Sequence, residues 1–197
     1  MKEAIIIFVR NPHLGKVKTR LAATIGDEEA LDIYKQLLLH TMQEAGKSDA
    51  DKFVFYHEQI ESDDIWKQNG FKKKLQTGES LGDKMKAAFD EVFSLGYNRV
   101  IIIGSDCPQL SSKIINNGFR LLDEHDVVIG PASDGGYYLL GMKKNHGFLF
   151  DNKAWSTGSV FDESIKDMQQ YHLSTGLLPV LTDVDTEADW IESKNLL

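Results

Sequence analysis

The sequence predicts an α/β fold with a mainly parallel, mixed sheet that is covered by helices on both faces. Two apolar runs rich in Ile and Val, at 4–9 and 99–104, are typical of strands buried on both faces. Helical and strand-like stretches alternate along most of the chain, which is the pattern of parallel strands joined by crossover helices. The alternation breaks at 126–150, where two strand-like runs lie too close together for a helix between them. We therefore expect one antiparallel pair there.

The individual elements follow from hydrophobic spacing and turn residues. Strands are expected at 4–9, 52–57, 71–77, 99–104, 126–132, 136–142 and 177–182. Helices are expected at 30–45, 62–69, 81–95, 112–122, 159–170 and 187–196. Ser80 with Asp83, and Thr186 with Asp189, have the spacing of a capping box, which marks the start of a helix.

The composition is typical of one soluble domain that acts on small molecules. A chain of 197 residues is long enough to bury a substantial core, and we expect a single domain over 1–197. The formal net charge of −8 argues against a general nucleic-acid or anionic-membrane binder. No apolar run reaches the length of a membrane span, no signal-peptide pattern is present, and the single cysteine cannot form an internal disulfide. These features favour a cytoplasmic protein without membrane insertion.

Positive charge gathers in the loop after the first strand, although the chain is acidic. The segment RNPHLGKVKTRLA at 10–22 holds four cations and no acid: Arg10, Lys16, Lys18 and Arg20. Ligands of open α/β sheets bind beyond the carboxyl ends of the strands, which is where this loop lies. Gly15 would allow a close approach of the backbone to a phosphate, and the cations would neutralise a diphosphate. We predict a phosphate site here; the alternative is a solvated basic turn. The spacing fits neither a P-loop nor a dinucleotide glycine fingerprint.

Two aspartates are candidate metal ligands. Asp106 follows the strand at 99–104, where a carboxylate can bind Mg²⁺ or Mn²⁺ that bridges phosphate oxygens. The alternative role, capping the next helix, suits Ser111 better because it lies closer to that helix. Asp185 is left as a second ligand because the capping box accounts for its neighbours. Cys107 has no nearby histidine and is expected to be a small buried residue.

The segment GPASDGGYYLLG supplies candidate residues for a sugar or acceptor. Asp134 precedes Gly135 and Gly136, where it could bind a sugar hydroxyl or assist a metal, or could serve only a tight turn. Tyr137 and Tyr138 point to opposite faces in an extended segment, so at most one faces a ligand.

A second candidate stretch for the same ligand is Trp155-Ser156-Thr157. It combines an aromatic ring with two hydroxyl groups. The alternative is that Thr157 or Ser159 caps the following helix.

Six motifs occur in a characteristic order: FVRNPHLGKVKTRLA, GESLGDKM, GSDCPQL, GPASDGGYYLLG, WST and DVDTEADW. Together they resemble a bacterial family of uncharacterised glycosyltransferase-like proteins, of a type associated with arsenosugar biosynthesis. The motifs cover nearly the whole chain. The resemblance implies the GT-A, or nucleotide-diphospho-sugar transferase, fold with three layers. It also implies a transferase that uses a nucleotide and a divalent metal, Mg or Mn.

The wider superfamily includes molybdenum-cofactor and phospholactate guanylyltransferases, in which the loop after the first strand holds base and phosphates. The resemblance therefore assigns nucleotide contacts to three groups of residues in this chain. They are Phe8, Val9 and Arg10 near the base, Lys18 to Arg20 at the phosphates, and Gly78, Leu81 and Gly82 beside the nucleotide. Asp106 and Asp185 match metal-binding positions.

Our main expectation is glycosyl-type transfer from a nucleotide-diphospho-sugar to an unknown small acceptor. Asp106 would act through the metal, while Lys18 and Arg20 would stabilise charge that develops on the diphosphate. The first alternative is transfer of a nucleotidyl group from an NTP to a phosphorylated small molecule, with release of pyrophosphate. The second is a nucleotide-binding module without catalysis. The chain lacks the Pro-Lys of many sugar nucleotidyltransferases and has Ser-Asp-Cys in place of the Asp-x-Asp of glycosyltransferases.

Overall fold

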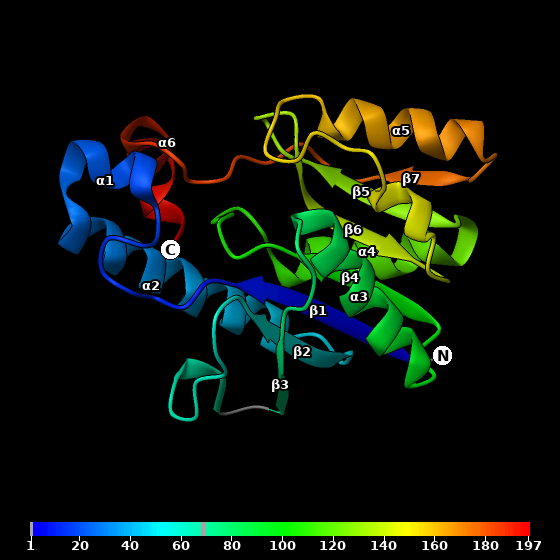
Figure 1. Ribbon diagram of the computed structural model, residues 1–197, viewed down its shortest axis with the longest axis horizontal. Helices are drawn as coiled ribbons and strands as arrows, with labels where there is room; N and C mark the ends of the chain where they lie inside the picture. The colour runs from blue at the N-terminus through cyan, green and yellow to red at the C-terminus, as the bar shows by residue number, and fades with distance from the viewer. Residues whose placement is uncertain (1, 68–69) are drawn as a thin grey trace.

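The protein has a seven-stranded sheet between two layers of helices (Figure 1). The computed structural model describes residues 2–67 and 70–197. The strands are β1 (Glu3–Val9), β2 (Asp51–Tyr56), β3 (Phe71–Leu75), β4 (Arg99–Ile103), β5 (Val127–Pro131), β6 (Tyr137–Met142) and β7 (Thr175–Leu177). The helices are α1 (Thr19–Ile25), α2 (Asp27–Gly46), α3 (Leu81–Ser94), α4 (Ser112–Glu124), α5 (Val160–Gln170) and α6 (Glu187–Ser193), with 3₁₀ turns η1 (Ile65–Lys67), η2 (Gly147–Phe150) and η3 (Lys194–Leu196).

The sheet is mixed, as the sequence predicts. Its strand order is β3-β2-β1-β4-β6-β5-β7, and β6 runs antiparallel to both of its neighbours. The other pairs of neighbouring strands are parallel. The chain leaves β1 toward β2 and β3 and then returns to β4 on the opposite side of β1. Such a reversal is where open α/β sheets bind ligands, so the loops after β1 and β4 flank the expected crevice.

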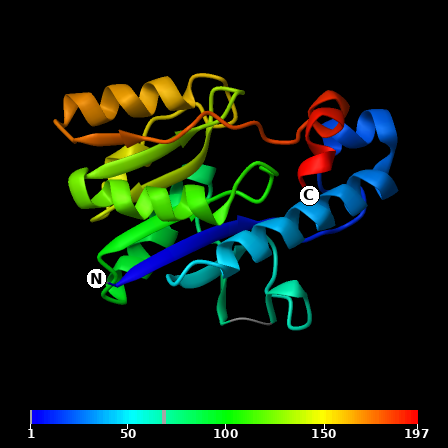
Figure 2. The same ribbon diagram turned by 180° about the vertical axis from the view of Figure 1, so that it is seen from behind.

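Alternate residues of the central strands serve two different cores. Ile5 and Ile7 of β1 pack toward α2 and α4, which cover one face (Figure 2). Ile6 lies in the other core with α3 and η2, where α5 also packs (Figure 1). A strand buried on both faces requires a continuous apolar run, because successive side chains point to opposite sides.

The segment that follows β1 meets the C-terminal segment beyond the carboxyl end of β1. Leu21 of α1, three residues of α2 and Val184 form a separate apolar cluster against which Trp190 of α6 packs. Figures 1 and 2 both show α1 beside α6 at this end of the molecule. The basic segment is thus not all loop: a helix begins at Thr19, because Leu21 gains apolar partners that are distant in sequence. This arrangement brings residues 18–20 next to 184–185.

Two predicted elements differ from the structure. The strand expected at 177–182 is wrong in position, since β7 ends at Leu177 and only Leu181 continues the pairing, through an isolated bridge to Ala132. Pro179 lacks an N–H group and interrupts the ladder. The helix expected at 62–69 is only the 3₁₀ turn Ile65–Lys67, and residues 68–69 lie outside the described residues.

Both predicted capping boxes are confirmed. Ser80 caps α3 and Thr186 caps α6, each with its aspartate three residues later. No helix in the described part of the chain is both long enough and apolar enough to cross a membrane.

Asn11 fixes the loop after β1 to the loop after β2. Its side chain is 3% exposed, and its Nδ2 donates to the Gln59 carbonyl at 2.9 Å and to Glu61 Oε1 at 3.1 Å. Its Oδ1 accepts from the Glu58 N–H at 3.1 Å. A buried amide with three partners fixes the position of both loops.

We expect Asn11→Ala to lower the free energy of unfolding by about 2 kcal/mol, because it leaves buried partners without hydrogen bonds. Urea denaturation measures the change. The matched variant Asn116→Ala alters an exposed residue of α4 and should change stability by about 0.5 kcal/mol or less. Equal effects of the two changes would contradict the structural role of Asn11.

Candidate functional site

The Lys18 ammonium group lies between the two aspartates that were predicted to hold a metal. Its Nζ is 2.8 Å from Asp106 Oδ2 and 3.6 Å from Asp185 Oδ1, and it donates to the Val184 carbonyl at 2.6 Å. Its side chain is 4% exposed. This cation turns inward and joins the loops after β1 and β4 to the C-terminal segment. Its contact with phosphate stays a prediction.

The other cations of the basic segment stay at the surface. Arg20 is 73% exposed with Nη1 3.4 Å from Asp185 Oδ2, and Lys16 is 61% exposed with Nζ 3.6 Å from Glu58 Oε2. Exposed ion pairs of this kind contribute little to stability. The phosphate of a ligand could therefore replace the carboxylate partner of either cation at little cost in free energy. Gly15 lies beside them in a left-handed conformation, φ 72°. The four cations of the segment are thus divided into one buried cation, Lys18, and three exposed ones.

Tyr34 of α2 couples the end of β1 to the end of β4. Its hydroxyl accepts from the Arg10 N–H at 2.9 Å and donates to the Arg10 carbonyl at 3.1 Å. The same hydroxyl lies 3.5 Å from Ser105 Oγ, which donates to Asp106 Oδ1 at 3.3 Å. Burial and the nearby Asp106 charge raise the pKa of Tyr34 well above its usual range, so the hydroxyl keeps its proton. The Arg10 side chain itself is exposed.

Val9, a predicted contact residue, and Cys107, which was expected to be buried, both lie in the core. The Val9 side chain is 3% exposed and packs in the core on the α2 side, so only its backbone could reach a base. Cys107 is buried, as predicted, and burial raises the pKa of its thiol to about 12. A thiol with that pKa is not a nucleophile at neutral pH.

Asp183 forms an acidic cluster with Asp106, Asp134 and Asp185, and the sequence analysis did not single it out. Burial, together with the charges of Asp106, Asp134 and Asp185, raises its pKa to about 7, while Lys18 opposes the shift. Val184 between the two aspartates is fully buried. Because alternate residues of an extended segment face the same side, the Asp-Val-Asp pattern was the signal that could have identified it.

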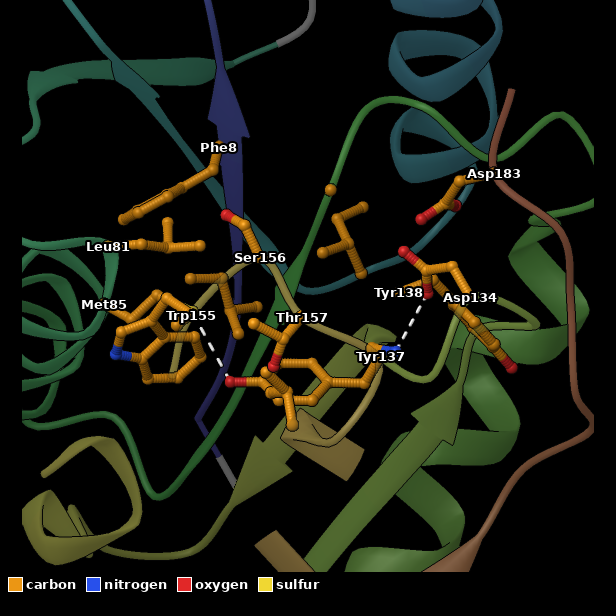
Figure 3. Close-up of a pocket in the computed structure, with 15 residues that line it drawn as sticks. Phe8, Leu81, Met85, Asp134, Tyr137, Tyr138, Trp155, Ser156, Thr157 and Asp183 are labelled. Atoms are coloured by element: carbon orange, nitrogen blue, oxygen red, sulfur yellow. Dashed lines mark hydrogen bonds between the residues drawn. The ribbon is translucent and has the colours of Figure 1, made fainter. Parts of the chain in front are cut away.

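A pocket of about 230 Å³ opens between the end of β1, the start of α3 and the loops at 133–136 and 155–159 (Figure 3). Its apolar end is formed by Phe8, Leu81, Met85 and Trp155, and its acidic end by Asp134 and Asp183. The pocket brings together eight of the predicted contact residues: Phe8, Leu81, Asp134, Gly136, Tyr137, Trp155, Ser156 and Thr157.

Two of the predicted glycines shape the pocket without lining it. Gly135 has φ 87°, and a Cβ there would lie 2.1 Å from the Gly158 carbonyl oxygen, so the backbones of the two loops touch. Gly78 has φ 131°, and a Cβ there would lie 2.7 Å from Asp83 Cβ at the start of α3. The turn interpretation of Asp134 also holds, because its Oδ1 accepts from the Gly136 N–H at 2.8 Å.

The hydroxyl groups at 156–159 do not cap α5. Ser159 is the N-cap residue but accepts no hydrogen bond from the helix backbone, and Thr157 Oγ1 donates to the Ala154 carbonyl at 2.7 Å. Ser156 has φ 65°, a left-handed conformation that is uncommon for a residue with a side chain. Ser156 and Thr157 therefore line the pocket without capping the helix.

The acidic cluster suits a divalent cation that arrives with phosphate. Carboxylate oxygens are the donors that Mg²⁺ prefers, and Lys18 is the one cation that lowers the raised pKa of Asp183. Among residues 2–67 and 70–197 no group of three or more His, Cys, Asp or Glu is placed to hold a metal. Mg²⁺ is commonly held by one or two carboxylates with substrate phosphates and water, so the donors fit that mode. The metal site at Asp106 and Asp185 stays a prediction.

Gly82 allows Trp155 to pack against the start of α3. A Cβ at Gly82 would lie 2.5 Å from Trp155 Nε1 and 2.7 Å from the Phe150 carbonyl oxygen. We expect Gly82→Ala to displace Trp155, to shift tryptophan fluorescence to longer wavelength and to lower stability by about 1–3 kcal/mol. Gly46→Ala is the matched control, since nothing lies within 4 Å of a Cβ there. Unchanged fluorescence in Gly82→Ala would contradict this packing.

The raised pKa of Asp183 predicts a pH-dependent gain in stability for Asp183→Asn. The unfolded state loses the Asp183 proton near pH 3.8 and the folded state near pH 7, so between these pH values folding binds a proton and stability falls as the pH rises. In protein freed of metal with a chelator, the thermal midpoint should rise more at pH 8 than at pH 4.5. The exposed Asp49→Asn serves as the control and should show no such difference. A rise of equal size at both pH values would refute the assignment.

The chain is similar to nucleotide-dependent transferases over most of its length. A solved structure described as "putative nucleotide-diphospho-sugar transferase" from Desulfovibrio desulfuricans G20 is 32% identical, with a TM-score of 0.88 over 94% of this chain and 84% of that one. The fold is therefore that of the nucleotide-diphospho-sugar transferases, as predicted. A curated relative, 2-phospho-L-lactate guanylyltransferase of Methanocaldococcus jannaschii, is 27% identical over 89% of this chain and 76% of its own length.

A more distant structure shares only the fold. Rv0371c from Mycobacterium tuberculosis H37Rv, in complex with manganese, is 12% identical with a TM-score of 0.56, and the match covers 100% of both chains. The model of the family described as "Uncharacterized protein conserved in bacteria (DUF2064)" matches residues 39–157, more than half of the chain. The chain belongs to the DUF2064 family.

Proposed function

We propose that the protein is a metal-dependent nucleotidyltransferase that moves a nucleoside monophosphate from an NTP to a phosphorylated small molecule and releases pyrophosphate. One observation carries the proposal. At the switch point between β1 and β4, the Lys18 ammonium and the carboxylates of Asp106 and Asp185 form a charged centre beside an apolar pocket. The curated relative, a guanylyltransferase, supports nucleotidyl transfer as the reaction.

In this reaction an oxygen of the acceptor phosphate attacks the α-phosphorus of the NTP. The bond from that phosphorus to the bridging oxygen breaks, and pyrophosphate leaves with the bonding electrons. A divalent metal held by Asp106 and Asp185 would neutralise the charge of the phosphates. Lys18 is a positioning residue that holds these two carboxylates together, and the exposed Lys16 and Arg20 would bind the outer phosphates.

The nucleotide is proposed to lie along the end of β1 and the start of α3. Phe8 and Leu81 both line the pocket at its apolar end, where a base could pack. The Arg10 backbone is held in place by Tyr34. The exposed Gly15 leaves the backbone of the loop open to a phosphate.

Glycosyl transfer is the second candidate, and the solved structure described as a "putative nucleotide-diphospho-sugar transferase" favours it. The curated relative argues against it, since that protein is a guanylyltransferase and not an arsenosugar glycosyltransferase. The two reactions differ in the phosphate product. Glycosyl transfer releases a nucleoside diphosphate from a nucleotide sugar, whereas nucleotidyl transfer releases pyrophosphate from an NTP.

We expect pyrophosphate to appear when the protein is incubated with Mg²⁺ or Mn²⁺, each NTP in turn and a panel of phosphate monoesters, followed by phosphorus NMR. Asp106→Asn should lower the rate at least about 100-fold, because the developing charge loses its metal. The exposed Asp49→Asn should leave the rate unchanged. A nucleoside diphosphate formed from a nucleotide sugar would favour the second candidate. Full activity of a folded Asp106→Asn protein would refute the site.

A further inference from the structure

The pocket beside the charged centre contains no basic side chain to receive an anionic ligand. Its described lining residues include no Lys, Arg or His, and its charged members are Asp134 and Asp183. Figure 3 shows the two carboxylates facing each other at one end of the pocket. A carboxylate-bearing ligand would meet like charge there, which disfavours its binding.

Two aromatic rings also line the pocket. They belong to Tyr137 and Trp155, and they lie 6.5 Å apart at 83°. The Tyr137 hydroxyl contacts Met85 Sδ at 3.6 Å, so its oxygen already has a partner. Aromatic faces attract cations, and cages of such rings are a common way to recognise organic ammonium groups. The apolar wall and the two carboxylates therefore favour the same kind of ligand.

Within residues 2–67 and 70–197, no strong hydrogen-bond donor faces the Asp183 carboxylate. The neighbouring groups that act on it are the Cys107 thiol, a weak donor, and the charges of Asp106, Asp134, Asp185 and Lys18. A buried carboxylate that faces only a weak donor is stabilised by a ligand that brings positive charge or an N–H donor.

The acidic end of the pocket also adjoins the reacting centre. Asp183 lies two residues from Asp185, and Asp185 shares the Lys18 ammonium with Asp106. A group held there is close to the phosphate that reacts, whereas a nucleobase is separated from the α-phosphorus by its ribose. The volume of about 230 Å³ suits a small substituent and is below the range of drug-sized ligand sites. These points favour the acceptor as the occupant of this end.

We propose that the pocket binds the organic part of the acceptor and that this part carries an ammonium group, so that the acceptor is a phosphate monoester of a small amino alcohol. The proposal rests on the proposed nucleotidyl transfer. Asp134 provides the counter-charge, and the rings of Trp155 and Tyr137 provide the apolar wall. The expected acceptor thus differs from the phosphorylated acid named in the curated relative.

Binding is tested first, without catalysis, on the full chain in the presence of Mg²⁺. Isothermal titration calorimetry compares choline with 3,3-dimethyl-1-butanol, its neutral analogue of the same shape. Choline should bind at least about tenfold more tightly, and Asp134→Asn or Trp155→Leu should remove most of that preference. Asp151→Asn, an exposed acid away from this pocket, should retain it. Equal affinity for the two probes, or displacement of choline by a free nucleoside, would overturn the proposal.

Turnover then separates this proposal from the proposed function. Phosphocholine and phosphoethanolamine are compared with 3,3-dimethylbutyl phosphate and 2-phospho-L-lactate, with pyrophosphate as the readout. Higher turnover of the two amine esters is expected. Turnover of 2-phospho-L-lactate alone would refute the amine acceptor and leave nucleotidyl transfer intact. Selective choline binding without pyrophosphate from any pair of substrates would support the amine pocket and refute nucleotidyl transfer.

Discussion

One buried ammonium group holds the functional end of this protein together. Lys18 lies in a left-handed conformation, φ 49°, at the start of α1, and from there its Nζ reaches Asp106, Asp185 and the Val184 carbonyl. These partners come from the loop after β4 and from the segment before α6. Removing this cation would leave Asp106 without its ion-pair partner and Asp185 with only the exposed Arg20, which is more costly than the loss of an exposed ion pair.

The backbone around this ammonium group is built to keep it in place. Val184 donates its N–H to the Asp106 carbonyl at 2.9 Å while its side chain packs with Leu21. Tyr34 joins the end of β1 to Ser105 from the opposite side. The loops that carry the charged centre are thus fixed by side chains of α1 and α2, and a fixed position is a condition for electrostatic stabilisation. Lys16 and Arg20 stay exposed beside it.

The fold places the pocket, and the side chains of this chain give the pocket its chemistry. The fold is shared with a solved structure described as a "putative nucleotide-diphospho-sugar transferase". The aromatic wall depends on local features of this sequence, above all on Gly82, whose missing side chain makes room for Trp155. A fold places the site, whereas the side chains around the pocket decide what it binds.

Local periodicity and turn chemistry are enough to predict the layered fold, the antiparallel pair, both capping boxes and the two loops that carry the site. They also indicate eight of the residues that line the pocket. Three features follow instead from packing in three dimensions: Lys18 turns inward, a helix begins at Thr19, and Asp183 lies near Asp106. Each of these depends on partners more than 70 residues away in the chain, such as Asp106 and Val184. The Asp-Val-Asp pattern places Asp183 on the side of Asp185, but the direction of a side chain at a loop is set by the distant charge and apolar surface that it contacts.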